Sequence, residues 1–321
     1  MSKFGAHVSI GRRDGFGAAL AQCQAAGSPV PVLFALDQNL WPDVQQYSPA
    51  TTLIFRTQID GQPNPPALWQ ADPVETAAGW YTRCRPIWAQ NRAHYYAPGN
   101  EYDPQTLAHF DWLNAYELKL MQLADADGLK LAIGAHSTGT PSDDGGQTRY
   151  EKWARLLPSL QYAKAHGHIL LLHEYGLTGY LRDSAPHLAL RYRSALDCLR
   201  QFAADPITVI SECSGFNGYA GQPDWFDDLC WYDAQVLGDP RVLGFCAYQL
   251  GGAENWSRFI PRWAEYVSAH PTPPVEPPPP QTHTLIRVEP AVRVSIVIDA
   301  TLDRNRVIVT RGLDVDVRVI E

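Results

Sequence analysis

Basic residues are scarce in this sequence, and those present do not cluster. Lys and Arg together number 26 against 34 Asp and Glu, so the formal net charge is −8. Pairs such as Arg12-Arg13 stay isolated. Binding to a nucleic-acid backbone needs clustered cations that release counterions from the phosphates. The sequence therefore predicts no nucleic-acid partner.

Long apolar runs are missing as well. No stretch approaches the roughly 20 consecutive apolar residues of a membrane span, and the segment from Met1 to His7 lacks the apolar run of a signal peptide. We expect a soluble chain without a membrane partner. The compartment stays open, because a trimmed precursor would allow an extracellular location, and the oligomeric state is not indicated.

Cysteine and glycine motifs that hold metals or nucleotides are absent. The six cysteines show no C-x-x-C spacing, which favours buried free thiols over a disulfide framework or a zinc site. No G-x-G-x-x-G follows an early apolar stretch. We therefore expect neither a bound metal nor a cofactor.

Short apolar stretches alternate with helical patterns from residue 4 to about residue 270. Eight such units is the number at which a parallel sheet closes into a (β/α)8 TIM barrel of the α/β class. The apolar runs are mostly continuous, as expected for strands buried on both faces. The expected strands are 4–8, 30–36, 52–55, 93–97, 129–134, 168–172, 207–210 and 242–248.

Helix signals accompany these strands. Asp72 before Pro73 and Asp103 before Pro104 each predict a cap followed by proline at the first helical position. We expect helices over 104–124, over 149–166 with a bend at Pro158, and over 188–204.

The composition changes abruptly after residue 270. Residues 271–282 form a proline-rich linker, expected to be extended and semi-rigid. Residues 283–321 read as short alternating strands, which predicts a small all-β appendage that packs on the barrel, dimerises, or is the start of a truncated β-sandwich. The expected organisation is thus a barrel over 1–270, a linker, and a β-module.

Two glutamates follow expected strands at the end of the barrel where active sites lie in this fold. In eightfold barrels the active site lies at the carboxyl ends of the strands, where Glu101 follows the fourth strand and Glu212 the seventh. Paired carboxylates are what glycoside hydrolysis requires: one protonates the leaving oxygen, and the other attacks the anomeric carbon or activates water. A separation of about 5 Å predicts retention of configuration and roughly 6.5–9.5 Å predicts inversion.

Asn100-Glu101 and Ser211-Glu212, at the ends of strands four and seven, resemble the clan of retaining β-glycosidases that carries catalytic glutamates at these places. The resemblance covers the barrel and implies Glu101 as acid/base, neutral through burial, and Glu212 as the ionised nucleophile. It further implies that Asn100 binds the sugar 2-hydroxyl, that Tyr175 touches the nucleophile, and that Arg56 keeps the nucleophile ionised. The implied substrate is a β-linked carbohydrate.

The chain departs from that clan's pattern at two points. Tyr102 follows Glu101 where the clan often has proline, and strand eight ends in Tyr248 and Gln249 where the clan usually has a tryptophan platform. Trp256 or Trp225 are candidates to replace that platform.

The remaining residues at strand ends have competing interpretations. Glu174 is a candidate substrate ligand, a rival nucleophile, or a salt-bridge partner of Arg56. His136 contacts a ligand or packs in a loop, Asp37 binds a hydroxyl or caps the next turn, and His7 is expected to be buried near the floor of the site. The expected substrate-binding set is Asn100, Arg56, His136, Glu174, Tyr175, Tyr248, Gln249 and Asp37.

Two other functions compete with glycoside hydrolysis. The first is a metal-dependent barrel enzyme, such as a sugar isomerase or a phosphodiesterase, with His136, His173, Glu174 and Glu212 as ligands. Phe4-Gly5-Ala6-His7-Val8-Ser9 resembles the opening of the endonuclease IV family of metal barrels. The second is a barrel that binds a glycan without cleaving it.

Overall fold

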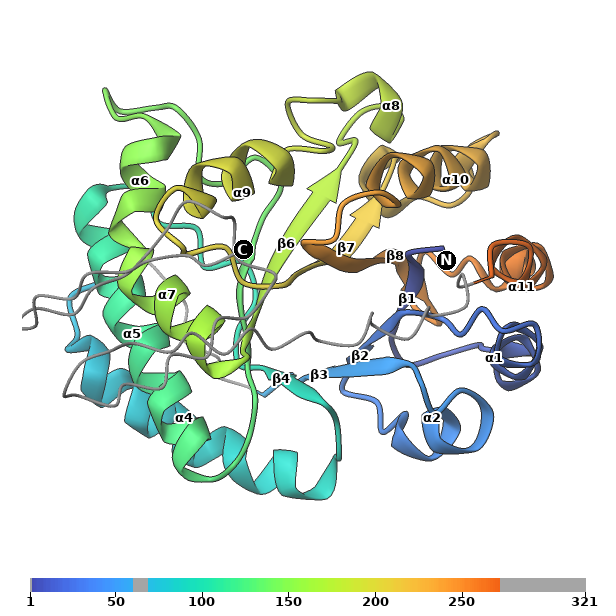
Figure 1. Cartoon of the computed structure of the whole chain (residues 1–321), viewed down its shortest axis with the longest axis horizontal. Helices are drawn as coiled ribbons and strands as arrows, with labels where there is room; N and C mark the ends of the chain where they lie inside the picture. The colour runs from blue at the N-terminus through green and yellow to red at the C-terminus, as the bar shows by residue number, and fades with distance from the viewer. Residues whose placement is uncertain (1, 60–68, 272–321) are drawn as a thin grey trace, which may run out of the picture. The chain divides into compact units, whose positions relative to one another are not determined.

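The computed structural model describes residues 2–59 and 69–271, and these form a (β/α)8 barrel (Figure 1). Eight parallel strands are hydrogen-bonded in the order β4-β3-β2-β1-β8-β7-β6-β5. The ring closes through a parallel bridge between Tyr96 and Leu131, where the Tyr96 amide donates to the Lys130 carbonyl at 2.9 Å. The strands are β1 (Phe4–Val8), β2 (Val32–Leu36), β3 (Thr52–Arg56), β4 (Tyr95–Ala97), β5 (Ala132–His136), β6 (Ile169–Tyr175), β7 (Thr208–Ser214) and β8 (Val242–Leu250).

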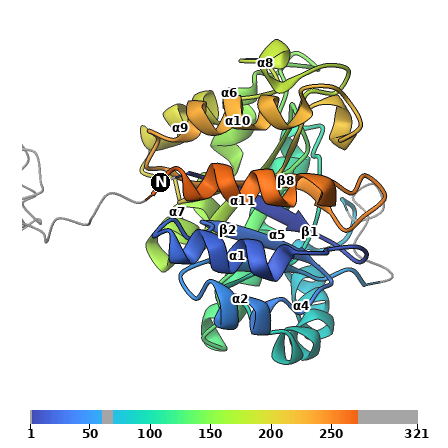
Figure 2. The same ribbon diagram turned by 90° about the vertical axis from the view of Figure 1, so that its right-hand side faces the viewer.

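Helices surround the strands on the outside of the ring. Figure 2 shows α11 beside α1, which brings the last described helix against the first. The α-helices are α1 (Phe16–Ala25), α2 (Trp41–Tyr47), α4 (Pro73–Gln90), α5 (Leu107–Ala126), α6 (Arg149–Arg155), α7 (Leu157–His166), α8 (Leu181–Ser184), α9 (Tyr192–Arg200), α10 (Trp225–Val236) and α11 (Ile260–Ser268). Two 3-10 turns, η1 (Phe216–Gly218) and η2 (Ser257–Phe259), follow β7 and β8.

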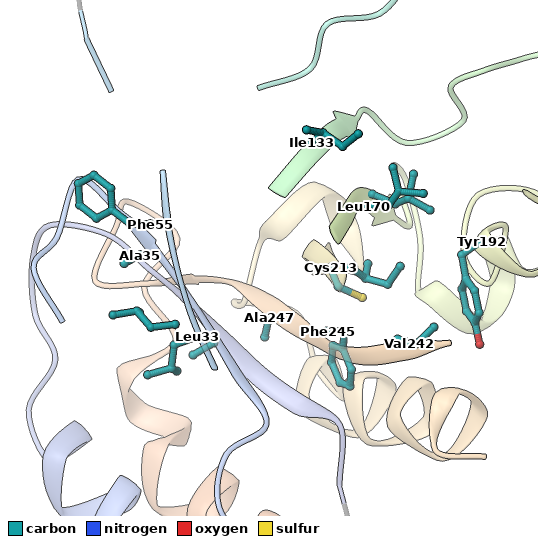
Figure 3. Packing of buried hydrophobic residues seen from close by; sticks show 14 of the residues in the cluster. Leu33, Ala35, Phe55, Ile133, Leu170, Tyr192, Cys213, Val242, Phe245 and Ala247 are labelled. Carbon is teal, nitrogen blue, oxygen red and sulfur yellow. The ribbon is translucent and has the colours of Figure 1, made fainter. Parts of the chain in front are cut away.

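The buried apolar side chains fall into two layers, as the barrel requires. One layer fills the space between strands and helices, and Figure 3 shows some of its members, including Phe55, Leu170 and Phe245. The other, smaller layer fills the inside of the ring with residues such as Phe34 and Val209. Because both faces of the strands are buried, the strand sequences are continuously apolar, as expected.

Several predicted boundaries were wrong. Helix α5 begins at Leu107 with Thr106 as its cap, since the Thr106 hydroxyl accepts from the His109 amide, whereas Asp103 instead binds Ser137. The predicted helix over 149–166 is two helices that meet at Leu156. The predicted helix over 188–204 is shorter, and strands β6, β7 and β8 extend further at their carboxyl ends than expected.

Other local predictions were confirmed. The Asp72 carboxylate accepts from the amides of Val74 and Glu75 at 2.9 Å and caps α4. All six cysteines are free thiols; four are buried as expected, and Cys198 and Cys230 are partly exposed. Within residues 2–59 and 69–271, every helix is too short or too polar to cross a membrane.

By its internal contacts the chain divides into Met1–Thr272 and Pro273–Glu321. Apart from Pro271, the predicted linker over 271–282 and the predicted β-module over 283–321 lie outside the described residues, and both stay predictions.

Candidate active site at the carboxyl end of the barrel

Glu212 lies near the end of β7 with separate partners for its two oxygens. Oε1 accepts from the Arg56 guanidinium at 2.8 Å and lies 3.5 Å from Nε2 of His7. Oε2 accepts from the Tyr175 hydroxyl at 2.8 Å and lies 3.6 Å from Nδ1 of His173. The plane of this carboxylate is therefore fixed from both sides.

These partners keep Glu212 ionised. The residue is only 6% exposed, and burial by itself would raise its pKa. The charges of His173 and Arg56 and the contact with His7 outweigh burial and hold the pKa of Glu212 well below its usual range. The result is a carboxylate that stays charged at neutral pH although it is almost enclosed by protein.

Glu101 approaches the same place from the loop after β4. Its backbone has φ 51°, in the left-handed region, and its amide donates to the carbonyl of Ala135 at 2.9 Å. One carboxylate oxygen lies 2.9 Å from Nδ1 of His173. The Glu101 side chain is 40% exposed, so the expected burial of this carboxyl group was wrong. It is held by His173 and remains open to solvent.

The two carboxyl groups and His173 converge. One ligand atom from each of Glu101, His173 and Glu212 lies within 4.8 Å of the other two. The 4.8 Å limit applies to the nearest ligand atoms, whereas the roughly 5 Å of a retaining pair and the roughly 6.5–9.5 Å of an inverting pair are separations between whole carboxyl groups.

Arg56 connects β3 to both the candidate nucleophile and the loop of the candidate acid. Its Nη1 donates to Oε1 of Glu212 at 2.8 Å and to Oδ1 of Asn100 at 2.5 Å. The guanidinium also lies over the Phe34 ring, with 5.7 Å between Cζ and the ring centroid. Asn100, Arg56 and Glu212 are thus brought together, as the sequence predicts.

Tyr248 and Gln249 line the same end of the barrel. The Tyr248 ring lies 5.0 Å from the His7 ring and 5.7 Å from the Tyr175 ring, measured between centroids. The Gln249 amide donates to the Tyr248 hydroxyl at 2.7 Å and accepts from the Ser9 hydroxyl at 2.6 Å. Both side chains therefore adjoin the Glu212 cluster.

Glu174 does not join this cluster. It is 1% exposed, and its carboxylate accepts from the amides of Leu190 and Tyr192 and from the Tyr232 hydroxyl. Burial raises its pKa to about 7. Its side chain binds α9 and α10 to the outside of β6, so the interpretations of Glu174 as rival nucleophile, substrate ligand or partner of Arg56 were wrong.

His136 and Asp37 are the last two residues of the predicted set. The His136 ring packs edge-on against Trp153 of α6, with 5.5 Å between centroids, and is 1% exposed, so its packing interpretation holds and its ligand interpretation does not. Asp37 follows β2 with φ 50°, and its amide donates to the Arg56 carbonyl at 3.0 Å. Its two interpretations, binding a hydroxyl and capping the next turn, stay predictions.

His173 is the site residue that the predicted set left out. The alternation of side chains along a strand could have identified His173. Tyr175 faces the site, and His173, two residues earlier on β6, lies on the same face of the strand. The same period turns Glu174 outward. His7 is fully buried, as predicted, and its Nε2 lies 3.5 Å from Oε1 of Glu212, which was not predicted. Burial lowers the pKa of His7.

The two tryptophans considered as replacements for a sugar platform are both buried. The Trp225 indole donates to the Ser214 hydroxyl, and the Trp256 indole donates to the Ala247 carbonyl. Their exposures are 1% and 0%, so neither can stack on a sugar in this conformation.

No family model matches the sequence, and no curated protein matches it. Solved structures do match, and they are glycoside hydrolases built on the same eightfold barrel. An endo-β-mannanase/endo-β-glucanase from Prevotella bryantii is 11% identical, with a TM-score of 0.50, over 83% of this chain and 48% of that one. A family 5 glycoside hydrolase from the same organism, solved with a xyloglucan tetradecasaccharide, is 10% identical, with a TM-score of 0.50, over 83% and 96%.

A glucosidase from Croceicoccus marinus is 12% identical, with a TM-score of 0.47, over 80% of this chain and 62% of that one. The present chain therefore spans less than two thirds of the Croceicoccus chain and of the two-activity Prevotella chain. At identities of 10–11%, the two matches with a TM-score of 0.50 show that the fold is shared. They do not identify the substrate or the roles of individual residues.

Proposed function

We propose that this chain is a glycoside hydrolase that cleaves a β-linked carbohydrate with retention of configuration. The observation that carries the proposal is the approach of Glu101 and Glu212 to within 4.8 Å at the carboxyl end of the barrel. The fold shared with glycoside hydrolases supports it.

In the proposed first step, Glu212 attacks the anomeric carbon and Glu101 gives its proton to the departing glycosidic oxygen. The C–O bond to the leaving group breaks as the bond to Glu212 forms. In the second step Glu101, now a carboxylate, takes a proton from water, and the resulting hydroxide displaces Glu212. The enzyme then returns to its starting protonation.

The neighbouring residues have defined tasks in this scheme. Arg56 and Tyr175 hold the Glu212 carboxylate charged and oriented for attack. Nδ1 of His173 lies 2.9 Å from Glu101, where it can position the proton of the acid/base. In this scheme Asn100, whose Oδ1 accepts from Arg56, binds the sugar hydroxyl next to the reacting carbon.

The proposal is tested on a panel of aryl β-glycosides and β-glycan polysaccharides with the variants Glu212→Gln and Glu101→Gln. We expect Glu212→Gln to be inactive on every substrate. Glu101→Gln should lose about 10²–10⁴-fold on substrates with poor leaving groups and far less on dinitrophenyl glycosides, which need no acid. Full activity in either variant on polysaccharide would refute the assigned pair.

A metal-dependent reaction is the second candidate, because Glu101, His173 and Glu212 bring three ligand atoms close together. The ligand set expected from the sequence does not form, since His136 and Glu174 point away from this place. The cation of Arg56, 2.8 Å from Glu212, also competes with a metal ion for that carboxylate. Dialysis against EDTA separates the candidates: the glycosidase keeps its activity, and a metal enzyme loses it until metal is restored.

A further inference from the structure

The loop after β7 exposes an aromatic ring that the core does not use. Tyr219 is 51% exposed, and Asn217, two residues earlier, is exposed as well. Between them Gly218 is buried. By contrast, Trp225 and Trp256 at the same end of the barrel are buried.

This loop is held firmly. The amide of Phe216 donates to the Gly179 carbonyl at 2.8 Å, and the amide of Asn217 donates to the Gly176 carbonyl at 3.0 Å. On the other side, the Arg258 guanidinium donates to the carbonyl of Ala220 at 2.5 Å. The backbone of the loop is therefore bound to the segments that follow both β6 and β8.

The Tyr219 ring itself is supported by a glycine. A methyl group added at Gly221 would lie 2.4 Å from Cζ of Tyr219, so the ring rests directly on the Gly221 backbone. No side chain other than that of glycine leaves room for this contact. Half of the ring's surface stays open although its position is set.

The same loop covers the tyrosines of the active site. A methyl group added at Gly218 would lie 2.7 Å from Cδ1 of Tyr248 and 3.9 Å from Cε1 of Tyr175. The Tyr175 hydroxyl in turn binds Glu212. Tyr219 thus follows directly after Gly218, which packs on Tyr248 and lies near Tyr175.

We propose that Tyr219 and Asn217 form a binding subsite for a sugar ring of the substrate outside the reacting centre. A pyranose presents an apolar C–H face, which packs on an aromatic ring, and hydroxyl groups, which an asparagine amide can bind as donor and acceptor. Because the subsite lies beyond the reacting sugar, it contributes only to substrates of several sugar units. The inference rests on the proposed function and extends it to a preference for oligosaccharides.

The test compares two substrates of the full-length chain. One is the aryl β-monoglycoside that the wild type cleaves fastest, and the other is a linear β-linked tetrasaccharide of the same sugar. Tyr219→Ala should raise KM for the tetrasaccharide about 5- to 10-fold, as expected for loss of one aromatic contact, and leave KM for the monoglycoside within about twofold. Asn217→Ala should act in the same direction and more weakly.

Gly221→Ala provides a second variant that keeps the tyrosine and displaces its ring. The Gly221 backbone lies outside the left-handed region, so alanine is accommodated once the ring moves. This variant should also raise KM for the tetrasaccharide alone. Phe202→Ala is the matched control, because Phe202 is 47% exposed and follows α9 at the opposite end of the barrel.

Equal effects of Tyr219→Ala on both substrates, or none on either, would overturn the subsite. A wild type that cleaves neither substrate would overturn the proposed function instead. The subsite is then decided by calorimetry with cellotetraose, mannotetraose and laminaritetraose: weaker binding of any of them by Tyr219→Ala supports it, and unchanged or absent binding refutes it.

Discussion

The two oxygens of Glu212 are held by different kinds of partner. The effect of each partner on the Glu212 carboxylate can therefore be measured separately. Arg56 supplies a full charge to Oε1, whereas Tyr175 supplies a neutral hydrogen bond to Oε2. Charge–charge attraction acts on the protonation of the carboxylate over several ångströms, whereas the hydroxyl acts only at contact distance.

Tyr175→Phe removes the hydroxyl and leaves the ring in its place against Tyr248. A hydrogen bond to a charged group contributes about 1.5–3 kcal/mol, so kcat/KM should fall by about 10- to 100-fold. The measurement is steady-state kinetics on an aryl β-glycoside, with circular dichroism to show that the variant is folded. A folded variant with wild-type kcat/KM would contradict the role assigned to Tyr175.

His173→Asn tests the charge next to Glu212. The charge of His173 lowers the pKa of Glu212 against the effect of burial, and asparagine can keep a neutral hydrogen bond to Glu101 without that charge. The pKa of Glu212 should therefore rise, and the acidic limb of the kcat/KM profile should move to higher pH. An acidic limb that stays in place would show that His173 does not set the ionisation of Glu212.

At the scale of elements, strand β6 shows what the sequence predicts and where prediction fails. Its residues alternate between the barrel interior and the helix layer, which places His173 and Tyr175 at the site and Glu174 against α9. This alternation can be predicted from the sequence. Applied to β6, it places the side chain of Glu174 on the helix side, away from the site.

Strand β7 behaves differently, and alternation would have misled there. The pairing of β7 with β8 shifts register between Ile210 and Cys213, so the side chain of Glu212 is not placed by counting from the buried residues before it. Its ordinal position, at the end of the seventh strand, identified it. Glu101 reaches the site through a left-handed backbone conformation. This conformation depends on tertiary contacts, so the neighbouring sequence does not predict it.

Glu117 gives a prediction about the contact between α5 and β5. It is 4% exposed, it accepts from the Gly134 amide at 2.8 Å, and burial raises its pKa to about 7. A carboxyl group whose pKa is higher in the folded than in the unfolded state stabilises the fold at low pH, and this contribution is lost as pH rises through 7.

Glu117→Gln keeps the carbonyl acceptor and removes the titration. The fall in the free energy of unfolding between pH 5 and pH 8 should be smaller in this variant than in the wild type by about 2–3 kcal/mol. Urea unfolding at the two pH values provides the measurement. Parallel pH dependence in both proteins would show that Glu117 titrates no differently once folded.

At the scale of the whole molecule, the barrel is complete in the part of the chain up to residue 271. The His270 carbonyl accepts from the Ser2 amide and the Ser28 hydroxyl, which ties the end of the barrel to its beginning. The strand count, and with it the fold, was predictable because each strand is a distinct apolar run between helical patterns. The assignment of the chain beyond residue 271 to a linker and β-module remains a prediction.

A chain of residues 1–271 should therefore fold and cleave a small aryl β-glycoside with a kcat/KM similar to that of the full chain. A chain ending at residue 259 is the control, because it lacks α11, whose Trp263 is fully buried against Phe4 and Phe16. The control should not fold. Thermal unfolding and activity are measured for both truncated chains. If the chain of residues 1–271 does not fold, the barrel depends on residues 272–321.

The central claim is that Glu212 forms a covalent bond to the sugar. It is tested most directly by incubating the enzyme with a dinitrophenyl 2-deoxy-2-fluoro derivative of the β-glycoside that it cleaves, followed by mass spectrometry of its peptides. We expect an inactivated enzyme that carries one fluoroglycosyl group on Glu212. An adduct on another residue, or continued hydrolysis through an intermediate-free reaction that inverts the anomeric configuration, would contradict it.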